Sequence, residues 1–329
     1  MFNRASARVV FMALFLLLSI AGCDIGLTYD PPLRIASAPW IGYTPFYVAR
    51  DRRLYGDMDV RIAEFSTDFD AARAGADGRV ELVCGTLSDI LRQRDQGTDL
   101  TIVAALDFSK GADGIVVRPP IADVAGLRGK RVGAEIGTLT HFVLLRALER
   151  AKVEEREVTI VNVAMEQALL AFEKGEVDAV SLWEPYLTKA EATGGKRIFS
   201  SAEIPGEILD VLAARTEVLA TRPGDIERVL LAWDGALDVI RRDPSASLPV
   251  MAAHVDMTVP DLKESLATVE LVDLKQNLRL FERGAGGGSV WEAYARAASF
   301  MTQNKLLKRP PADADAVLKP ALLQRAAAP

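Results

Sequence analysis

Short apolar runs alternate with helix-length segments along the first part of this chain, and this alternation constrains the fold more than any other feature. The expected strands cover 33–36, 59–65, 81–85, 100–106 and 114–118, and the expected helices cover 46–54, 68–74 and 87–94. Strands separated by helices of this length form a mostly parallel sheet that is covered on both faces. The sequence therefore predicts an α/β fold, with ligands bound beyond the carboxyl ends of the strands.

The same alternation begins again after Pro119 and Pro120. Further strands are expected at 131–134, 158–162 and 179–181, with helices at 140–152 and 165–174, and another apolar run covers 208–214. A chain that leaves one sheet, builds a second and returns joins two lobes by two connections and leaves a cleft between them. We expect lobe 1 at 33–117 and 210–329, and lobe 2 at 118–209.

The C-terminal third reads as purely helical. The expected helices cover 224–241, 244–254, 259–267 and 290–304. The run Gly284 to Ser289 lacks the Lys-Ser/Thr pair of a phosphate-binding loop and is interpreted as a turn. The end of the chain, 309–329, is rich in alanine and proline and is expected to lie over the surface or fray.

The first 22 residues have the pattern of an export signal. Arg4 and Arg8 precede an apolar run that ends in small residues and Cys23, and the run is short for a transmembrane helix. The segment LSIAGC resembles a bacterial lipobox, whose cysteine becomes the acylated first residue of the mature lipoprotein, carrying chains such as palmitate. In that family Asp24 favours retention in the inner membrane. We therefore expect a signal peptide at 1–22, a lipid anchor on Cys23 and a tether at 23–32.

The charge and cysteine content argue against a nucleic-acid-binding protein and against a protein stabilised by disulfides. The chain has 45 acidic and 39 basic residues, a formal net charge of −6, and no cluster of Lys and Arg, which argues against nucleic-acid binding. Membrane contact is expected through the lipid anchor. With Cys23 acylated, Cys84 is the remaining thiol, so no internal disulfide is expected and the core must supply the stability.

One strand-to-helix turn stands out as a candidate binding element. The strand at 131–134 is followed by Gly137 and Thr138, and then by a helix with apolar side chains at helical spacing. The first backbone N–H groups of such a helix have no intrahelical partner, and they lie at the positive end of the helix dipole. They suit an anion, a carbonyl oxygen or a ring nitrogen, although an ordinary turn would have the same pattern.

The sequence gives little support for a catalytic or metal site. The chain has two histidines, His141 and His254, and pairing either with a nucleophile has no support in the spacing. It has no HExxH or CxxC sequence and no cluster with zinc-ligand spacing. We therefore expect no catalytic residue, no metal and no cofactor.

Three segments carry a resemblance to a known family. They are WIGYTPFYVARDRRLYG (40–56), LRGKRVGAEIGTLTHFVLLRALERA (127–151) and FEKGEVDAVSLWEPYLTKA (172–190). Together they resemble the periplasmic solute-binding proteins of the nitrate, sulfonate, taurine and pyrimidine-precursor type. The resemblance covers about 33–305 and implies a type II periplasmic-binding-protein fold. It further implies a monomer that binds a small molecule by hinge closure and delivers it to an ABC permease and its ATPase on the periplasmic side of the inner membrane.

The same resemblance assigns the ligand-binding positions, which lie on loops that follow strands except for His141, one helical turn further on. They are Trp40, Thr86, Asp107, Phe108, Gly137, Thr138, His141, Trp183 and Glu184. Trp40 could stack on a flat or cationic ligand, and Thr86 and Thr138 stand at helix starts. Structural roles remain as alternatives, namely a core tryptophan, a helix N-cap, a solvated acid and a structural histidine.

The chemistry of the ligand is left open by these residues. The helix starts suit sulfonate, nitrate or carboxylate oxygens, whereas the aromatic and acidic positions suit an aromatic or nitrogen-bearing solute. No arginine falls on the expected cleft loops, which favours a small organic nitrogen compound. Two other functions remain as alternatives. One is an enzyme on the same fold, of the pyrimidine- or menaquinone-pathway type, and the other is a partner that presents ligand to a sensor.

Overall fold

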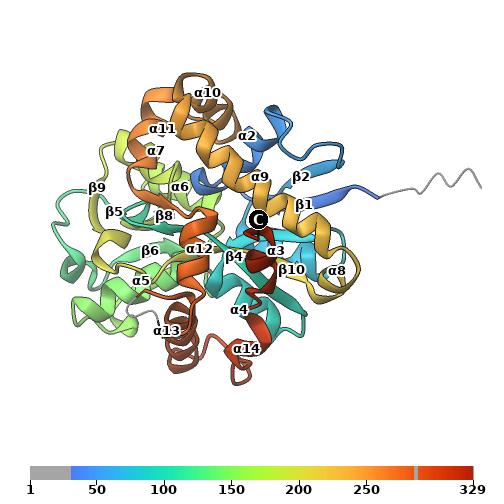
Figure 1. Cartoon of the computed structure of the whole chain (residues 1–329). Coiled ribbons are helices and arrows are strands. Elements are labelled where there is room, and N and C mark those ends of the chain that lie inside the picture. The colour runs from blue at the N-terminus through green and yellow to red at the C-terminus, as the bar shows by residue number, and fades with distance from the viewer. Residues whose placement is uncertain (1–30, 285–287, 329) are drawn as a thin grey trace, which may run out of the picture. The chain divides into compact units, whose positions relative to one another are not determined.

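The computed structural model describes residues 31–284 and 288–328, and residues 32–329 form one compact unit (Figure 1). The predicted signal peptide, the predicted lipidation site Cys23 and most of the predicted tether lie outside the described residues. None of the helices in the described part has the length and apolar character needed to cross a membrane.

The first sheet has the strand order β11-β4-β10-β3-β1-β2. Its strands are β1 (Leu33–Ser37), β2 (Val60–Glu64), β3 (Leu82–Thr86), β4 (Leu100–Ser109), β10 (Leu209–Arg215) and β11 (Val269–Leu271). Strand β1 pairs in parallel with β2 and β3, whereas β10 lies between β3 and β4 and is antiparallel to both. Strands β1 to β4 therefore run in one direction and end at one edge, as predicted for an α/β fold.

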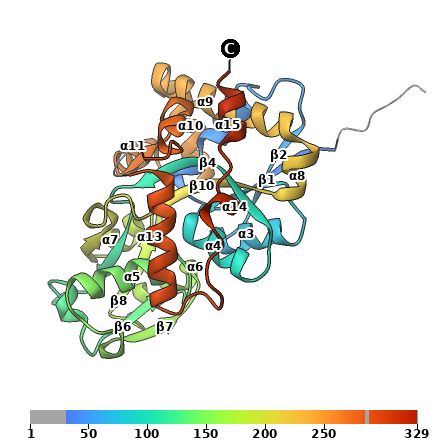
Figure 2. The same ribbon diagram turned by 60° about the horizontal axis from the view of Figure 1, so that its bottom comes forward.

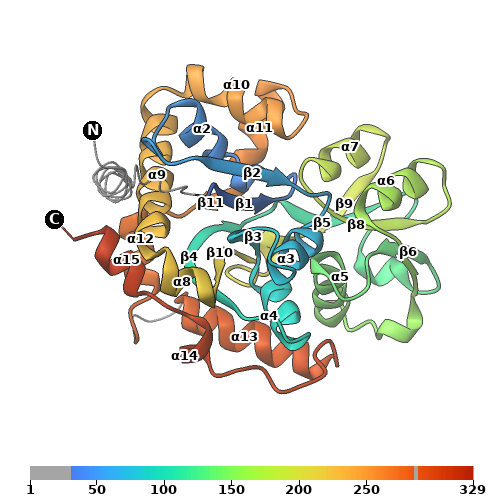
Figure 3. The same ribbon diagram turned by 90° about the vertical axis from the view of Figure 1, so that its right-hand side faces the viewer.

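The second sheet has the strand order β7-β6-β8-β5-β9. Its strands are β5 (Asp113–Val117), β6 (Arg131–Ala134), β7 (Thr159–Asn162), β8 (Ala179–Trp183) and β9 (Lys196–Ser200). Strand β6 pairs in parallel with β7 and β8, and β5 runs antiparallel to both β8 and β9. Figure 3 shows α5, α6 and α7 around this sheet.

The membership of β5 corrects the predicted boundary at residue 117. We expected β5 to close the first lobe, but it pairs with β8 and β9 in the second sheet. The chain therefore passes from one sheet to the other at 110–112, between β4 and β5, and returns at 201–208, between β9 and β10. Pro119 and Pro120 follow a strand of the second sheet and do not mark the crossing.

Helices cover both sheets. They are α2 (Pro45–Asp51), α3 (Asp68–Ala76), α4 (Leu87–Asp95), α5 (Leu139–Arg150), α6 (Met165–Glu173), α7 (Tyr186–Ala192), α8 (Thr216–Thr221), α9 (Pro223–Arg242), α10 (Pro244–His254), α11 (Val259–Leu266), α12 (Leu274–Leu280), α13 (Val290–Gln303), α14 (Ala314–Val317) and α15 (Ala321–Ala326). Several begin at a side-chain cap; for example, Thr67 accepts from Asp70 N–H and Ser289 from Glu292 N–H. The prolines at the starts of α9 and α10 have no N–H to leave unpaired.

Helix α13 links the two sheet regions. It packs on α4, which follows β3 of the first sheet, and its Phe300 lies 4.8 Å from the Phe142 ring of α5, which follows β6 of the second. Figure 2 shows α13 beside α5. The guanidinium of Arg146 in α5 lies over the same Phe300 ring. This guanidinium also forms an ion pair with Glu207 at 2.6 Å. This cluster holds α5 against a helix that comes late in the sequence.

The described C-terminal residues correct the expectation of a frayed end. Residues 314–317 and 321–326 are helical, and Leu318 forms a parallel bridge with Ile102 of β4. Leu322 and Leu323 are buried, and α15 packs against α9. Leu318, Leu322 and Leu323 are all buried, and burial of these leucines holds the segment in place despite its alanine and proline content.

Candidate functional site

Trp40 and Asp107 meet at the carboxyl ends of the strands in the first sheet. The Trp40 indole Nε1–H donates to Asp107 Oδ2 at 3.1 Å and to Oδ1 at 3.3 Å, and both residues are buried. Trp40 follows β1, and Asp107 lies near the end of β4. Gly42 permits this approach, because a Cβ built on it would lie 2.1 Å from Asp107 Oδ2 and 2.3 Å from Trp40 Nε1.

Two more buried acids lie beside this pair. Asp210 of β10 is directly opposite Asp107 in the β4–β10 ladder, so their side chains are on one face of the sheet. The Tyr43 hydroxyl donates to Asp210 Oδ1 at 2.5 Å and approaches Asp68 Oδ2 at 3.4 Å. The first sheet thus contributes three carboxyl groups, from α3, β4 and β10.

The second sheet contributes a fourth acid and a second tryptophan. Asp113 begins β5 and is directly opposite Trp183 at the end of β8, so the two side chains share one face. Asp113 is 1% exposed and Trp183 5% exposed. Within the described chain, the two Asp113 carboxyl oxygens have no hydrogen-bond partner, and the Trp183 Nε1–H has none either. Ser181, two residues before Trp183 and on the same face, likewise has an unpaired buried hydroxyl.

Burial dominates the electrostatics of these four acids. Burial, together with the charges of Asp210 and Glu184, raises the pKa of Asp113 to about 8, although the Ser109 hydroxyl and the Arg197 charge act to lower it. Burial also raises the pKa of Asp210 to about 7, against the hydrogen bond from Tyr43. The pKa values of Asp68 and Asp107 are raised by burial and then by the charge of Asp210. When two buried carboxyls lie side by side, as Asp107 and Asp210 do, ionisation of one makes ionisation of the other harder, so the pair retains one proton.

Thr86 acts as a helix cap in this structure. It precedes α4, its hydroxyl accepts from Asp89 N–H at 3.1 Å, and it donates to Asp89 Oδ2 at 2.7 Å. It also lines a space of about 10 Å³ together with Leu139 and Phe142 of α5. A role for Thr86 in ligand binding stays a prediction.

The predicted turn at Gly137 and Thr138 is in contact with the first sheet region through Arg92 of α4. The Arg92 guanidinium donates to the Gly137 carbonyl at 2.7 Å, and Gly137 has φ +86°, a conformation that favours glycine. His141 Nδ1 accepts from Gly137 N–H at 3.1 Å, and the Thr138 hydroxyl donates to Glu135 O. His141 therefore fixes the turn, and Arg92 is a contact that loop-based reasoning missed because it lies on a helix.

Glu184 is already paired within the protein. Its Oε1 accepts from Arg197 at 3.1 Å, and its Oε2 accepts from Thr188 N–H at 3.1 Å and from the Thr188 hydroxyl at 2.8 Å. The Glu184 side chain is 3% exposed. These bonds position the end of β8, and contact of Glu184 with ligand stays a prediction.

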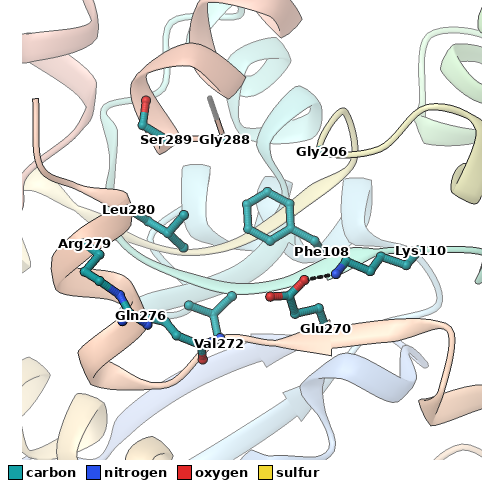
Figure 4. Close-up of a pocket in the computed structure, with 10 residues that line it drawn as sticks. All are labelled: Phe108, Lys110, Gly206, Glu270, Val272, Gln276, Arg279, Leu280, Gly288 and Ser289. Carbon is teal, nitrogen blue, oxygen red and sulfur yellow. Dashed lines mark ion pairs between the residues drawn. The ribbon is translucent and has the colours of Figure 1, made fainter. Parts of the chain in front are cut away.

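Phe108 faces a different space from its neighbour Asp107, because successive side chains of a strand point to opposite faces. We expected both on one loop, but β4 continues to Ser109. Figure 4 shows Phe108 in a cavity of about 410 Å³, close to the ion pair of Lys110 and Glu270. The structure thus brings Trp40, Asp107 and Trp183 into the acidic site region and places Phe108 elsewhere.

Sequence reasoning missed four residues of this region, namely Tyr43, Asp68, Asp113 and Asp210. Two of them had a readable signal: Asp113 stands directly before an apolar run, and Asp210 stands within one. A charged residue in a buried strand is uncommon unless it is paired or functional.

Known solved structures share this fold. The alkanesulfonate-binding protein SsuA from Xanthomonas axonopodis pv. citri, bound to MOPS, has a TM-score of 0.74 at 20% identity, over 88% of this chain and 98% of that one. The desulfurization enzyme DSZB has a TM-score of 0.66 at 16% identity, over 90% and 99%. These likenesses confirm the predicted periplasmic-binding-protein fold.

Sequence comparisons point the same way. A protein of Escherichia coli strain K12 named for binding aliphatic sulfonates is 26% identical over 77% of this chain and 81% of its own. The taurine-binding periplasmic protein of the same strain is 24% identical over 49% and 51%. The model of the family described as NMT1/THI5 like matches residues 40–247. This chain belongs to the NMT1/THI5-like family.

Proposed function

We propose that this protein is the substrate-binding component of an ABC importer, anchored by a lipid on Cys23 at the periplasmic side of the inner membrane. One observation carries the proposal: Trp40 and Asp107 are hydrogen bonded where the strands of the first sheet end, Asp113 and Trp183 are paired and buried in the second sheet, and Asp113 is close enough for its charge to act on Asp107. Ligand sites of open α/β sheets lie at this position. The names of the relatives, which include binding proteins for aliphatic sulfonates and for taurine, support a transport role.

The proposed mechanism is closure of two lobes around a small organic solute. The first sheet, with its helices, forms one lobe and the second sheet forms the other, joined at 110–112 and 201–208. Bound solute favours the closed state to the extent that it binds that state more tightly. Contacts such as Arg92 to the Gly137 carbonyl would break on opening and form again on closure. The closed form then docks on the permease.

A thermal-shift screen of the purified chain tests solute binding. The panel contains sulfonates, taurine, nitrate, pyrimidines and amines, and a ligand at one hundred times its Kd should add about 2.7 kcal/mol to stability. Trp40→Ala should weaken any hit at least tenfold in calorimetry, whereas Trp291→Ala, in the distant helix α13, should not. The solute recovered from the complex should be chemically unchanged, and a converted product would favour the enzyme alternative.

Labelling with radioactive palmitate tests the anchor. The wild-type chain should take up label and sediment with membranes. Cys23→Ala should do neither, and equal labelling of both chains would refute the anchor.

A further inference from the structure

The proposed site contains more buried negative groups than its own hydrogen bonds satisfy. Both Asp113 oxygens and Asp68 Oδ1 lack a partner within the described chain, and these residues are 1% and 7% exposed. A buried ionised carboxylate without a partner costs several kcal/mol. The site must therefore hold protons in place of charge, or receive positive charge from outside.

These unsatisfied groups belong to one region. The charge of Asp113 acts on the pKa values of both Asp68 and Asp107, and the charge of Asp210 acts on that of Asp113. Their carboxyls come from α3, β4, β5 and β10, which are far apart in the sequence. Four elements from different parts of the chain therefore each contribute a buried acid to this region.

The nearby arginines are used elsewhere. Arg197 donates to Glu184, Glu191 and the Gly111 carbonyl, and Arg92 donates to the Gly137 carbonyl. Within the described residues, no Lys, Arg or His forms an ion pair with any of the four aspartates, which are Asp68, Asp107, Asp113 and Asp210. The charge of Arg197 acts on Asp113 without an ion pair between them, and this guanidinium is already paired with Glu184 and Glu191.

Two further groups point to a bound molecule independently of the acids. The Trp183 Nε1–H and the Ser181 hydroxyl are buried, unpaired and on the same face of the second sheet as Asp113. Buried donors of this kind normally have a partner. Trp183 needs an acceptor and Asp113 needs donors, so the matching molecule carries both.

We propose that the ligand is a small organic cation, with a protonated amine or amidine nitrogen bound by Asp113 together with Asp107 and Asp210, and an acceptor atom near Trp183. The inference rests on the proposed binding function and narrows its substrate class. The indoles of Trp40 and Trp183 add aromatic surface, which attracts cations through the ring quadrupole. A sulfonate or nitrate in the same place would face four acids and no free arginine.

Matched probes that differ in charge test the proposal. Benzamidine, its neutral isostere benzamide, benzylamine and benzenesulfonate are added at millimolar concentration to the purified full-length chain in detergent, with methylguanidine, putrescine and taurine alongside. We expect one or more of the cations to raise Tm, and benzamide and benzenesulfonate to leave it unchanged.

The outcomes separate this inference from the function on which it rests. Stabilisation by benzenesulfonate, which has no amine, with none by any cation or by taurine, whose amine is protonated, would overturn the cationic ligand and leave a binding protein. Absence of stabilisation by every compound, in this set and in the wider screen above, would overturn both.

Asp113→Asn provides the sharpest variant. It keeps the shape of a side chain whose charge has no partner, so the ligand-free protein should fold and be at least as stable as wild type at pH 8. Its affinity for the best cation should fall at least tenfold in calorimetry. The control Asp57→Asn, at an exposed position paired with Arg228, should bind as wild type does. Wild-type affinity in Asp113→Asn would refute the assignment.

Discussion

Replacing Arg197 with methionine tests how much the hydrogen bonds of this side chain contribute to the stability of the second sheet near the proposed site. The Arg197 guanidinium donates to Glu184 Oε1 at 3.1 Å, to both Glu191 oxygens at 2.8 and 3.0 Å, and to the Gly111 carbonyl at 2.9 Å. Gly111 belongs to the first connection between the sheets. One side chain therefore links β9, the end of β8 and the crossing segment.

Most of the free energy of unfolding lost in Arg197→Met should come from Glu184, which is left buried without its ionic partner. Removing one partner of a buried ion pair costs about 3–5 kcal/mol, and Glu184 is 3% exposed. Thr188 still donates twice to the other Glu184 oxygen, which favours the lower end, about 3 kcal/mol. Glu191 is 36% exposed, so its share is at most about 1 kcal/mol. The total is about 3–4 kcal/mol, and at about 2–4 °C for each kcal/mol Tm should fall by roughly 6–16 °C.

Urea and thermal unfolding at pH 7 measure this loss. Arg156→Met is the matched control, because Arg156 is 80% exposed and pairs with a surface glutamate, and it should cost at most about 1 kcal/mol. Combining Arg197→Met with Glu184→Gln removes the stranded charge and should recover part of the loss. The reasoning is wrong if Arg197→Met costs less than about 1 kcal/mol, or if the double variant is no better than the single one.

Three other expectations follow from the same contacts. Gly42→Ala should weaken solute binding in calorimetry more than tenfold, because its methyl would occupy the space between Trp40 and Asp107, and unchanged affinity would contradict the geometry. Burial raises the pKa of Asp113 from its ordinary 3.8 to about 8, so the folded state holds an extra proton between these values. The Tm of the ligand-free protein should therefore fall as the pH rises from 5 to 8, and Asp113→Asn should flatten that slope; a slope equal to that of wild type would speak against it. Cys84 is fully buried and burial raises its thiol pKa, so thiol reagents should modify it only as fast as the protein unfolds, as mass spectrometry would show; rapid modification of the native protein would disagree.

Local patterns predicted most of the secondary structure. The strand at 131–134 and the helix at 244–254 have the bounds observed for β6 and α10. The two strands missed, β9 and β11, had weak signals: β9 begins with Lys196 and Arg197, and β11 has three residues. Both gain their stability from a partner strand, which a local pattern does not contain.

The candidate site was less predictable because it depends on pairs that are distant in sequence. Trp40 and Asp107 were both expected in the cleft, but their hydrogen bond spans 67 positions. Asp107 and Phe108 were expected on one loop, but they lie within β4, which runs three residues further than its apolar core. Strand alternation then sends the two side chains to opposite faces. Asp113 directly precedes the run expected as a strand at 114–118 and Asp210 lies within the run at 208–214, but only the strand pairing of the folded chain brings their carboxyls beside Trp183 and Asp107.

The position of β10 between β3 and β4 has a consequence for how the chain can be divided. Ser109 N–H donates to the Ile208 carbonyl at 3.2 Å, so the two ends of the intervening segment 110–207 are hydrogen bonded to each other. That segment is topologically an insertion into the first sheet at a single place. Domain insertions of this kind leave the host ladder intact. A chain in which a short turn replaces 110–207 and joins Ser109 to Ile208 would keep every strand pairing of the first sheet. A circular permutant of the whole chain, with its new ends in the connection after Ser109, would keep every pairing of both sheets.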